Sequence, residues 1–512
     1  MRPLSTISLA FALLSSASYA DTSPALTEFT PCRIGIAPTT LPAECASITV
    51  PFTYGLTEGL QSQKVSGKLS GNVNEPTDPD TKKAPDVITL SIAKIAARSH
   101  QAAADPLTLL AGGPGQSATD SWPQLHAAFY PTLANRDIYL IDQRGTGNSV
   151  RMNCPQTHAS QELTLDLDKV RNTSLECYND QEHPTQWFTT SVAVRDLNTV
   201  REALGIANWN LYGVSYGTRV ALHYLRRYPE HTRSVILDAV VAPQKPIGPE
   251  LSLHSQQALD ALFARCANDT GCAEAFPDLA AKTKALFASL KESPRTIQYE
   301  NISLGALDSI EFNDQHLAST VRLLSYSSYG TAILPSMLYD AATNDNLAPF
   351  ARQTAIQLGQ LGGSLATGMH AAVICTEDAP YINTINDRDQ LAQTYLGDSV
   401  IDSMQASCEP WPRGIIDKDF HEPVVSDTPV LALSGAVDPI TPPSYAELAI
   451  ESLSNARHIV NPDQGHTQAP LGCMPIIMSQ FIDTITPAEL DLDCLERLAP
   501  PALFIDANGP LP

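Results

Sequence analysis

Basic residues are scarce in this sequence of 512 residues. Lys and Arg total 32 against 55 Asp and Glu, which gives a formal net charge of −23. An acidic surface repels the phosphate backbone, so nucleic acids are excluded as expected partners. The acidic residues form no long run of one charge, so a disordered acidic tail is not expected either. Internal repeats and low-complexity segments are also missing.

Metal-binding motifs are absent as well. The sequence contains no C-x-x-C and no H-E-x-x-H spacing, the patterns that bring thiolates or imidazoles together on zinc. We therefore expect no metal, and nothing else in the sequence implies a cofactor.

Long hydrophobic runs are missing beyond the N-terminus. Residues 1–20 are typical of a secretory signal: Arg2 supplies a positive start, residues 7–14 are mostly apolar, and Ala20 closes a cleavage site of small residues. The apolar part is too short to cross a bilayer, and no later stretch reaches about 18–20 uninterrupted apolar residues. No cysteine stands at the cleavage position, which disfavours a lipoprotein. We expect a protein secreted or exported to the periplasm, with no stable membrane association after cleavage.

Ten cysteines suit an exported chain, because an even number in an oxidising compartment favours disulfides. They fall into couples that are near in sequence, and this pairing is one of many that ten cysteines allow. The couples are Cys32 with Cys45, Cys154 with Cys177, Cys266 with Cys272, Cys375 with Cys408, and Cys473 with Cys494.

Short apolar segments bounded by turn residues alternate with helical patterns through the first half of the chain. Residues 192–205 and 216–230 have helical spacing, and the first of these ends at Gly205, a good C-cap. This alternation predicts a mainly parallel sheet with helices on both faces. The strand patterns lie at 46–55, 86–95, 106–115, 136–145, 208–217 and 233–242.

The pattern changes to helices from about residue 246 to residue 425. Strands of the core type return at 428–438 and 456–466. A helical insertion in an α/β sheet is typical of a cap or lid over a site.

Ser215 lies in the sequence Gly213-Val214-Ser215-Tyr216-Gly217, between a strand pattern and a helical pattern. Strand, sharp turn and helix form the nucleophile elbow, in which glycines leave room for the turn. The helix N-terminus behind Ser215 favours developing negative charge. The alternative is an ordinary serine in a β–α turn.

A nucleophilic serine needs a base and an orienting acid, in the order Ser, Asp or Glu, His for this architecture. Asp438 follows the strand pattern at 428–438, and His466 lies in the loop after the next strand. Both positions face the same edge of the sheet as Ser215, where strand ends carry catalytic groups. We therefore predict His466 as base and Asp438 as acid. The less suitable candidates are Asp427, Asp463, His370, His421 and His458.

The tetrahedral oxyanion needs two N–H donors. The backbone of Tyr216, the residue after the nucleophile, is one expected donor. The other is expected from the glycine-rich loop at 111–117, where Gly113 has an N–H and Pro114 does not. The alternative is an ordinary tight turn.

These motifs together resemble the α/β-hydrolase family of the proline iminopeptidases, and more closely its secreted branch related to the tripeptidyl aminopeptidases. The resemblance runs from about residue 45 to residue 495. It departs at Ala111, where the shorter intracellular enzymes usually have His. The matching stretches are GGPGQS (112–117), DQRGTGNS (142–149), YGVSYGTRVAL (212–222), VICTEDAP (373–380), CEPWP (408–412), SGAVDPITPP (434–443) and GHTQAPLGC (465–473).

The resemblance implies an α/β-hydrolase fold, a mainly parallel sheet flanked by helices, with a largely helical cap inserted before the strand preceding the catalytic acid. The expected organisation is a signal peptide at 1–20, a catalytic domain at 21–245 and 426–512, and the cap at 246–425. In that branch Cys375 and Cys408 are expected to pair with each other.

The resemblance also implies an exopeptidase that recognises the free N-terminus of short peptides. An ammonium in a closed pocket needs carboxylates, and Glu377 and Asp378 are the candidates by motif, unless they are surface or helix-capping acids. Asp142 and Arg144 are expected to brace the oxyanion loop rather than take part in the chemistry. Trp411 is expected to pack in the core or cap, the alternative being that it lines the substrate pocket.

Three functions are compatible with these residues. The first is a serine aminopeptidase acting on short peptides through an acyl-enzyme. The second is an esterase with the same triad. The third is a non-catalytic binding protein on a hydrolase scaffold, which the complete set of Ser215, Asp438 and His466 argues against.

Overall fold

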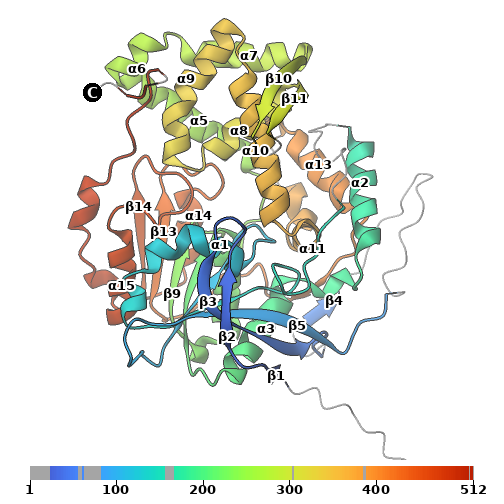
Figure 1. Cartoon of the computed structure of the whole chain (residues 1–512), viewed down its shortest axis with the longest axis vertical. Coiled ribbons are helices and arrows are strands. Elements are labelled where there is room, and N and C mark those ends of the chain that lie inside the picture. The colour runs from blue at the N-terminus through green and yellow to red at the C-terminus, as the bar shows by residue number, and fades with distance from the viewer. Residues whose placement is uncertain are drawn as a thin grey trace, which may run out of the picture.

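The computed structural model shows a central sheet below a helical cap (Figure 1). The signal sequence predicted at 1–20 lies outside the described residues. The structure describes residues 24–55, 60–62, 82–155, 166–302, 305–384, 388–506 and 508–510.

The central sheet has the strand order β1-β3-β5-β7-β6-β8-β9-β13-β14, with β2 paired to β3. The strands from β7 to β14 in this order run parallel, and β1, β2, β3 and β5 add an antiparallel edge. The bounds are β1 Ala25–Leu26, β2 Thr30–Ile34, β3 Leu41–Pro51, β5 Val87–Ile95, β6 Leu107–Leu110, β7 Ile138–Ile141, β8 Trp209–Val214, β9 Thr232–Asp238, β13 Val430–Gly435 and β14 Ala456–Asn461.

Helices cover both faces of this sheet. Helices α2, α3, α4 and α14 pack in the hydrophobic core of one face, and α1 and α15 in that of the other. The bounds are α1 Ala118–Leu125, α2 Leu167–Asp180, α3 Thr190–Ala203, α4 Tyr216–Arg227, α14 Pro443–Ile450 and α15 Met474–Thr484. Short 3₁₀ helices lie at His126–Phe129, Thr132–Ala134, Thr185–Trp187, Pro229–His231, Ala379–Thr384, Pro487–Glu489 and Asp493–Arg497.

The inner strands are apolar because both of their faces are buried. All six residues of β13 are buried. Val430 and Ala432 point into one core and Leu431 into the other. This alternation follows from the two-residue period of a strand, and a continuous apolar run is typical of parallel sheets covered on both sides. The fold predicted from the sequence is confirmed.

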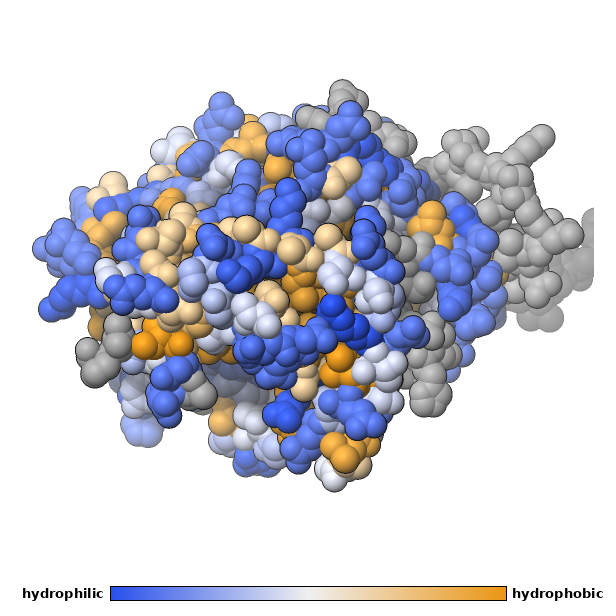
Figure 2. Space-filling model, turned by 90° about the horizontal axis from the view of Figure 1, so that it is seen from above, coloured by the Kyte–Doolittle hydropathy of each residue, from blue (hydrophilic) through white to orange (hydrophobic). Residues whose placement is uncertain are grey.

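The cap occupies the upper part of Figure 1 and has a hydrophobic core of its own. Seen from above, hydrophilic residues cover most of this end of the molecule, and hydrophobic residues lie among them in small groups (Figure 2). The bounds are α5 Leu251–Asn268, α6 Thr270–Ala275, α7 Leu279–Glu292, α8 Asp314–Leu324, α9 Ser328–Asn344, α10 Ala348–Ser364, α11 Thr367–Glu377, α12 Arg388–Ala392 and α13 Ser399–Cys408.

Three strands described within residues 246–425, β10, β11 and β12, were not expected from the sequence. Strands β10 Arg295–Asn301 and β11 Ala306–Phe312 form an antiparallel hairpin, where the pattern predicted only helices. Both strands are half exposed and rich in polar residues, so their apolar signal is weak. Strand β12 Ile415–Asp417 pairs with β4 Leu60–Ser62.

The C-terminal tail packs on the cap, although we expected all of 426–512 to belong to the catalytic domain. Leu503 is 3% exposed and belongs to the hydrophobic core of the cap. The N–H of Phe504 donates to the Ala332 carbonyl at 2.9 Å. Leu503 is buried there because the cap offers it an apolar surface.

The ten cysteines form five disulfides, and each cysteine has the partner expected from the sequence. Two of these bonds join elements that are adjacent along the chain. Cys32 of β2 is bonded to Cys45 of β3, the strand that pairs with β2. Cys266 of α5 is bonded to Cys272 of α6, and both of these cysteines lie in the core of the cap.

The other three disulfides close longer loops. Cys154–Cys177 ties the chain after β7 to α2. Cys375–Cys408 joins α11 to α13, and Cys473–Cys494 joins the start of α15 to the chain that follows this helix.

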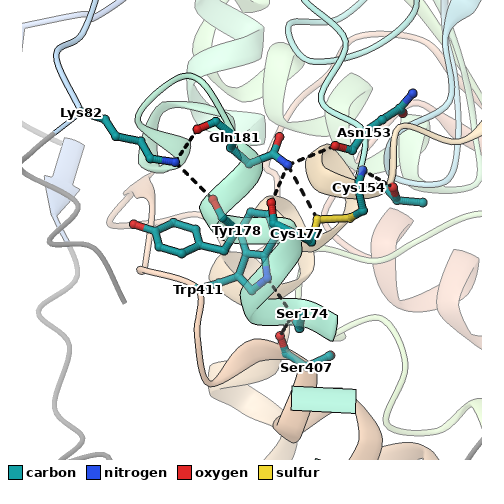
Figure 3. The surroundings of a disulfide bond; sticks show 10 residues. Lys82, Asn153, Cys154, Ser174, Cys177, Tyr178, Gln181, Ser407 and Trp411 are labelled. Carbon is teal, nitrogen blue, oxygen red and sulfur yellow. Dashed lines mark hydrogen bonds between the residues drawn. A yellow bond between two sulfur atoms is a disulfide. The ribbon is translucent and has the colours of Figure 1, made fainter. Parts of the chain in front are cut away.

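Trp411 is buried where α2 meets the chain after α13 (Figure 3). Its ring lies 5.6 Å from that of Tyr178, and its Nε1 donates to Ser174 Oγ at 2.9 Å. The Ser174 hydroxyl in turn donates to the Ser407 carbonyl. Trp411 is therefore a packing residue of the cap junction, as expected.

Over the described ranges, none of the helices combines the length and apolarity needed to cross a bilayer.

Candidate active site

Ser215 stands in the sharp turn between β8 and α4. Its backbone has φ 54° and ψ −126°, a strained conformation for a residue other than glycine. The turn is held by the Ser215 N–H, which donates to the Asp238 carbonyl at 2.9 Å. Thr218 donates to the Ser215 carbonyl from its N–H at 2.9 Å and from its hydroxyl at 2.6 Å. The structure therefore has the backbone of a nucleophile elbow at this position.

Gly217 allows α4 to approach the sheet closely. A Cβ at this position would lie 2.0 Å from the Leu110 carbonyl oxygen at the end of β6. Only glycine fits such a contact, so the spacing of Gly217 from Ser215 reflects the packing of the helix on the neighbouring strand.

His466 and Asp438 form the pair predicted from the sequence. His466 Nδ1 lies 2.8 Å from Asp438 Oδ2. The Ile440 and Thr441 N–H groups donate to Asp438 Oδ1 at 2.8 and 3.0 Å, and the Thr441 hydroxyl donates to Oδ2 at 2.8 Å. The carboxylate is thus held in place by its own loop and directed at the imidazole.

For both Asp438 and His466, burial and pairing shift the pKa in opposite directions. Burial disfavours the charged Asp438 carboxylate, but the charge and hydrogen bond of His466 outweigh it, and the pKa of Asp438 lies below its ordinary value. Burial disfavours the charged His466 imidazole in the same way, and the charge of Asp438 outweighs it, so the pKa of His466 lies above its ordinary value. The pair therefore favours an imidazole able to take up a proton.

Tyr326 of the cap holds His466 from the other side. The His466 N–H donates to the Tyr326 carbonyl at 2.8 Å, and the two rings lie 5.0 Å apart, edge to face. No local sequence pattern indicates this contact, because it joins the loop of His466 to the cap.

Ser215, Asp438 and His466 lie at one edge of the sheet. Val214 and Leu433, near the ends of β8 and β13, are both register partners of Asp238 at the end of β9. Among the described residues no hydrogen bond joins the Ser215 hydroxyl to His466. The structure therefore forms the acid–base couple and places Ser215 at the same edge of the sheet.

Asp238 is a further buried acid at this edge that the sequence analysis missed. Its carboxylate accepts hydrogen bonds from the N–H groups of Gln468 and Ala469 at 2.7 and 2.8 Å and from the Tyr212 hydroxyl at 2.8 Å. Burial raises the pKa of Asp238 to about 6. Since Gln468 and Ala469 follow His466 in the same loop, Asp238 is a positioning residue for that loop.

The glycine-rich loop runs directly beside Ser215. A Cβ at Gly112 would lie 3.1 Å from Ser215 Cβ, and Gly113 has φ 107°. The Gly115 carbonyl accepts from the Ala366 N–H at 2.9 Å, and the His370 Nδ1 lies 3.0 Å from the Pro114 carbonyl oxygen. The loop is therefore fixed from the side of α11, and His370, one of the histidines rejected as base, is a second positioning residue.

Asp142 and Arg144 brace different parts of the molecule. Asp142 accepts from the N–H groups of Thr119 and Asn148, at 3.0 and 3.1 Å, and so ties the loop after β7 to the start of α1, which directly follows the glycine-rich loop. Arg144 instead pairs with Asp196 of α3 and donates to carbonyls at the end of β3. Only Asp142 has the bracing role that we expected for both.

Glu377 is fully buried at the end of α11. It accepts from the Thr190 N–H at 2.7 Å and from the Thr190 hydroxyl at 2.9 Å, and that hydroxyl also bonds to the Tyr216 hydroxyl at 2.6 Å. Burial raises the pKa of Glu377 to about 8. The acid is thus linked by one threonine to the residue that follows Ser215.

Asp378 is fully buried beside it and pairs with Arg219 of α4. Arg219 Nη1 lies 2.8 Å from Asp378 Oδ1 and 3.9 Å from Glu377 Oε2. The Ile247 N–H donates to the same Oδ1 at 2.7 Å, whereas Asp378 Oδ2 has no hydrogen-bond partner among the described residues. Two buried carboxyl groups therefore share one guanidinium.

Within the described ranges, His, Cys, Asp and Glu side chains form no group of three or more that suits a metal ion.

A strained serine at a strand–helix turn, a histidine–aspartate couple at the same sheet edge and a helical cap above them define a hydrolase of the α/β class. A family model described as alpha/beta hydrolase fold matches residues 105–470, and the chain belongs to that family.

Relatives with assigned names are similar at low identity. YuaR of Escherichia coli, whose name places it only among hydrolases, is 24% identical over 457 residues, 84% of this chain and 83% of YuaR. The tripeptidyl aminopeptidase of Streptomyces lividans is 26% identical over 222 residues, 40% of this chain and 36% of that enzyme. The proline iminopeptidase of Neisseria gonorrhoeae is 27% identical over 135 residues, 26% of this chain and 32% of that enzyme. The resemblance to these peptidases is confirmed, and the matched part spans only about a third of each of them.

Proposed function

We propose that this hydrolase is an exported serine aminopeptidase that cuts short peptides near a free N-terminus. The Ser215 hydroxyl attacks the scissile carbonyl while His466 takes the proton of that hydroxyl. Asp438 orients and stabilises the resulting imidazolium. The N–H groups of Gly113 and Tyr216 bind the oxyanion. His466 then gives the proton to the leaving amine, and water, deprotonated by His466, releases the acyl group from Ser215.

Glu377 and Asp378, here called the acid pair, are the observation that favours a peptidase over an esterase. Glu377 and Asp378 share the single charge of Arg219, and Asp378 Oδ2 lacks a partner among the described residues. A substrate ammonium would supply the missing positive charge and stabilise the ionised form of Glu377. Both groups are enclosed in this structure, and the Ile247 N–H donates to Asp378 Oδ1, so the chain at Ile247 must move aside when a peptide binds.

Export is part of the proposal. All ten cysteines are joined in disulfides, which persist in oxidising compartments and are rare in the cytosol. Secretion and delivery to the periplasm both satisfy this condition.

The test uses chromogenic amides of single residues and tripeptides, with free and blocked N-termini, beside p-nitrophenyl acetate. We expect amide cleavage that needs the free N-terminus and is lost in Ser215→Ala. In Glu377→Gln we expect KM for free-N-terminus amides to rise about tenfold or more, because a neutral amide replaces a charge partner. Ester hydrolysis by the same variant should change much less.

Glu292→Gln, at an exposed position of α7 far from the acid pair in sequence, is the matched control. Ester cleavage without amide cleavage would reject the aminopeptidase in favour of an esterase. A Glu377→Gln variant with reduced thermal stability and unchanged KM would show that the acid pair is only structural.

A further inference from the structure

A cavity of about 620 Å³ lies between the ends of α8, α9 and α10 in the cap. Its walls are largely apolar, with Leu323, Leu324 and Ile333 from the helices and Phe504 from the C-terminal tail. Two polar residues of α10, Gln353 and Gln357, belong to the same lining. A space of this size and character suits an apolar group with a polar attachment, such as the side chain and main chain of a peptide residue.

The cavity adjoins both the loop that contains His466 and the glycine-rich loop beside Ser215. Tyr326 lines it and also accepts the His466 N–H at 2.8 Å through its carbonyl. Ser364 lines it as well, and the next residue, Leu365, pairs with Gln116 of the glycine-rich loop in an isolated β-bridge. A group in this cavity therefore lies next to the loop of the base and next to the oxyanion loop.

Helix α11 separates the cavity from the acid pair. The helix begins at Thr367, three residues after Ser364 and beside the glycine-rich loop. It ends at Glu377, next to Asp378. Eleven helical residues span about 16 Å, at 1.5 Å per residue, which is the length of about five residues of extended peptide. A short peptide with its N-terminus at the acid pair therefore reaches the cavity with residues beyond the scissile bond.

We propose that this cavity binds the residue that follows the scissile bond, and that it selects a large apolar side chain there. The proposal rests on the function proposed above, because the acid pair sets the direction of the peptide. His466, which protonates the leaving amine, lies on the same side as the cavity through its contact with Tyr326. The leaving peptide is thus placed in the apolar space, and the Gln353 and Gln357 carboxamides offer hydrogen bonds to its main chain.

The experiment compares peptides with one common N-terminal unit and Phe, Leu, Gly or Asp after the cut. We expect kcat/KM for Phe and Leu to exceed that for Gly and Asp by about tenfold or more, as burial of a large side chain allows. Ile333→Trp, which fills the cavity, should reduce this preference to about twofold or less. Each value is divided by the rate of the same variant on p-nitrophenyl acetate. The matched control is Ile302→Trp, at an exposed position of the cap, which should keep the preference.

Equal kcat/KM for all four peptides in the unmodified enzyme, or an unchanged preference in Ile333→Trp, would overturn the proposal. If no peptide is cut while the ester is, the aminopeptidase proposal fails by itself. The same peptides are then measured as competitive inhibitors of ester hydrolysis. Stronger inhibition by the Phe and Leu peptides, lost in Ile333→Trp, would still support the cavity, and equal inhibition would reject it.

Discussion

His466 is held on three sides by groups that come from different parts of the chain. Asp438 binds its Nδ1, Tyr326 of the cap accepts its backbone N–H, and Asp238 fixes the residues that follow it. An imidazole held in this way needs little reorganisation when a proton moves to it, which is the condition for efficient acid–base catalysis.

The variant Asp438→Asn tests what the carboxylate charge contributes to this arrangement. His466 must be neutral to act as a base, so activity falls as the pH drops through its raised pKa. Without the carboxylate charge that pKa falls, and the acidic limb of the pH profile of kcat/KM should move to lower pH. Above that limb, kcat should drop by on the order of 10³–10⁴-fold, because the imidazolium loses its partner.

Asp427→Asn is the control, since this exposed acid lies before β13, at the opposite end of that strand. Its profile should match that of the unmodified enzyme. An acidic limb that stays in place in Asp438→Asn would mean that another group sets the protonation of the base.

At the scale of elements, the position of Ser215 depends on the contact between α4 and the strands beside it. The helix begins directly after Ser215 and lies so close to β6 that Gly217 touches the last residue of that strand. The glycine is therefore a condition for the packing of α4 as well as for the elbow.

Gly217→Ala should destabilise the protein by about 1–3 kcal/mol or more, because its Cβ would overlap the Leu110 carbonyl oxygen. Urea unfolding followed by circular dichroism measures this loss. Gly359→Ala on α10 is the matched control. Apart from its chain neighbours and the backbone of its own helix, no atom of the described residues lies within 4 Å of the Cβ added there, so the change should be neutral or stabilise by up to about 1 kcal/mol. Equal stability of the two variants would contradict the close contact.

At the scale of the whole molecule, disulfides close loops along the chain, and the tail connects the catalytic domain to the cap. Cys375–Cys408 closes a loop within the cap, and Cys473–Cys494 ties α15 to the chain that leads to the tail. The tail then adds Leu503 to the core of the cap. Catalytic domain and cap are thus linked at the C-terminus as well as at the ends of the insertion.

Reduction should therefore lower the thermal midpoint by more than about 10 °C, since each disulfide of this kind contributes about 2–4 kcal/mol. Differential scanning calorimetry with and without dithiothreitol measures the shift. Mass spectrometry after alkylation should find no labelled cysteine in the native protein and ten after reduction and unfolding. Labelled cysteines without reduction would contradict both the pairing and the proposed export.

The features that depend on a local sequence pattern were predictable from the sequence. Strand and helix periods indicated the α/β fold, and the glycines around Ser215 indicated the turn. The spacing of Asp438 and His466 after their strands indicated the couple that the structure forms. The hairpin β10–β11 escaped prediction because its half-exposed strands carry little apolar periodicity.

The sequence by itself therefore determined the fold, the elbow and the order of the proposed catalytic residues, because each depends on neighbours along the chain. The tertiary structure alone decided which groups surround them. It placed Asp238 under the His466 loop, buried Glu377 and Asp378 against Arg219, and brought the tail to the cap. These contacts join residues distant in sequence, and they arise from the packing of elements, which no local spacing encodes.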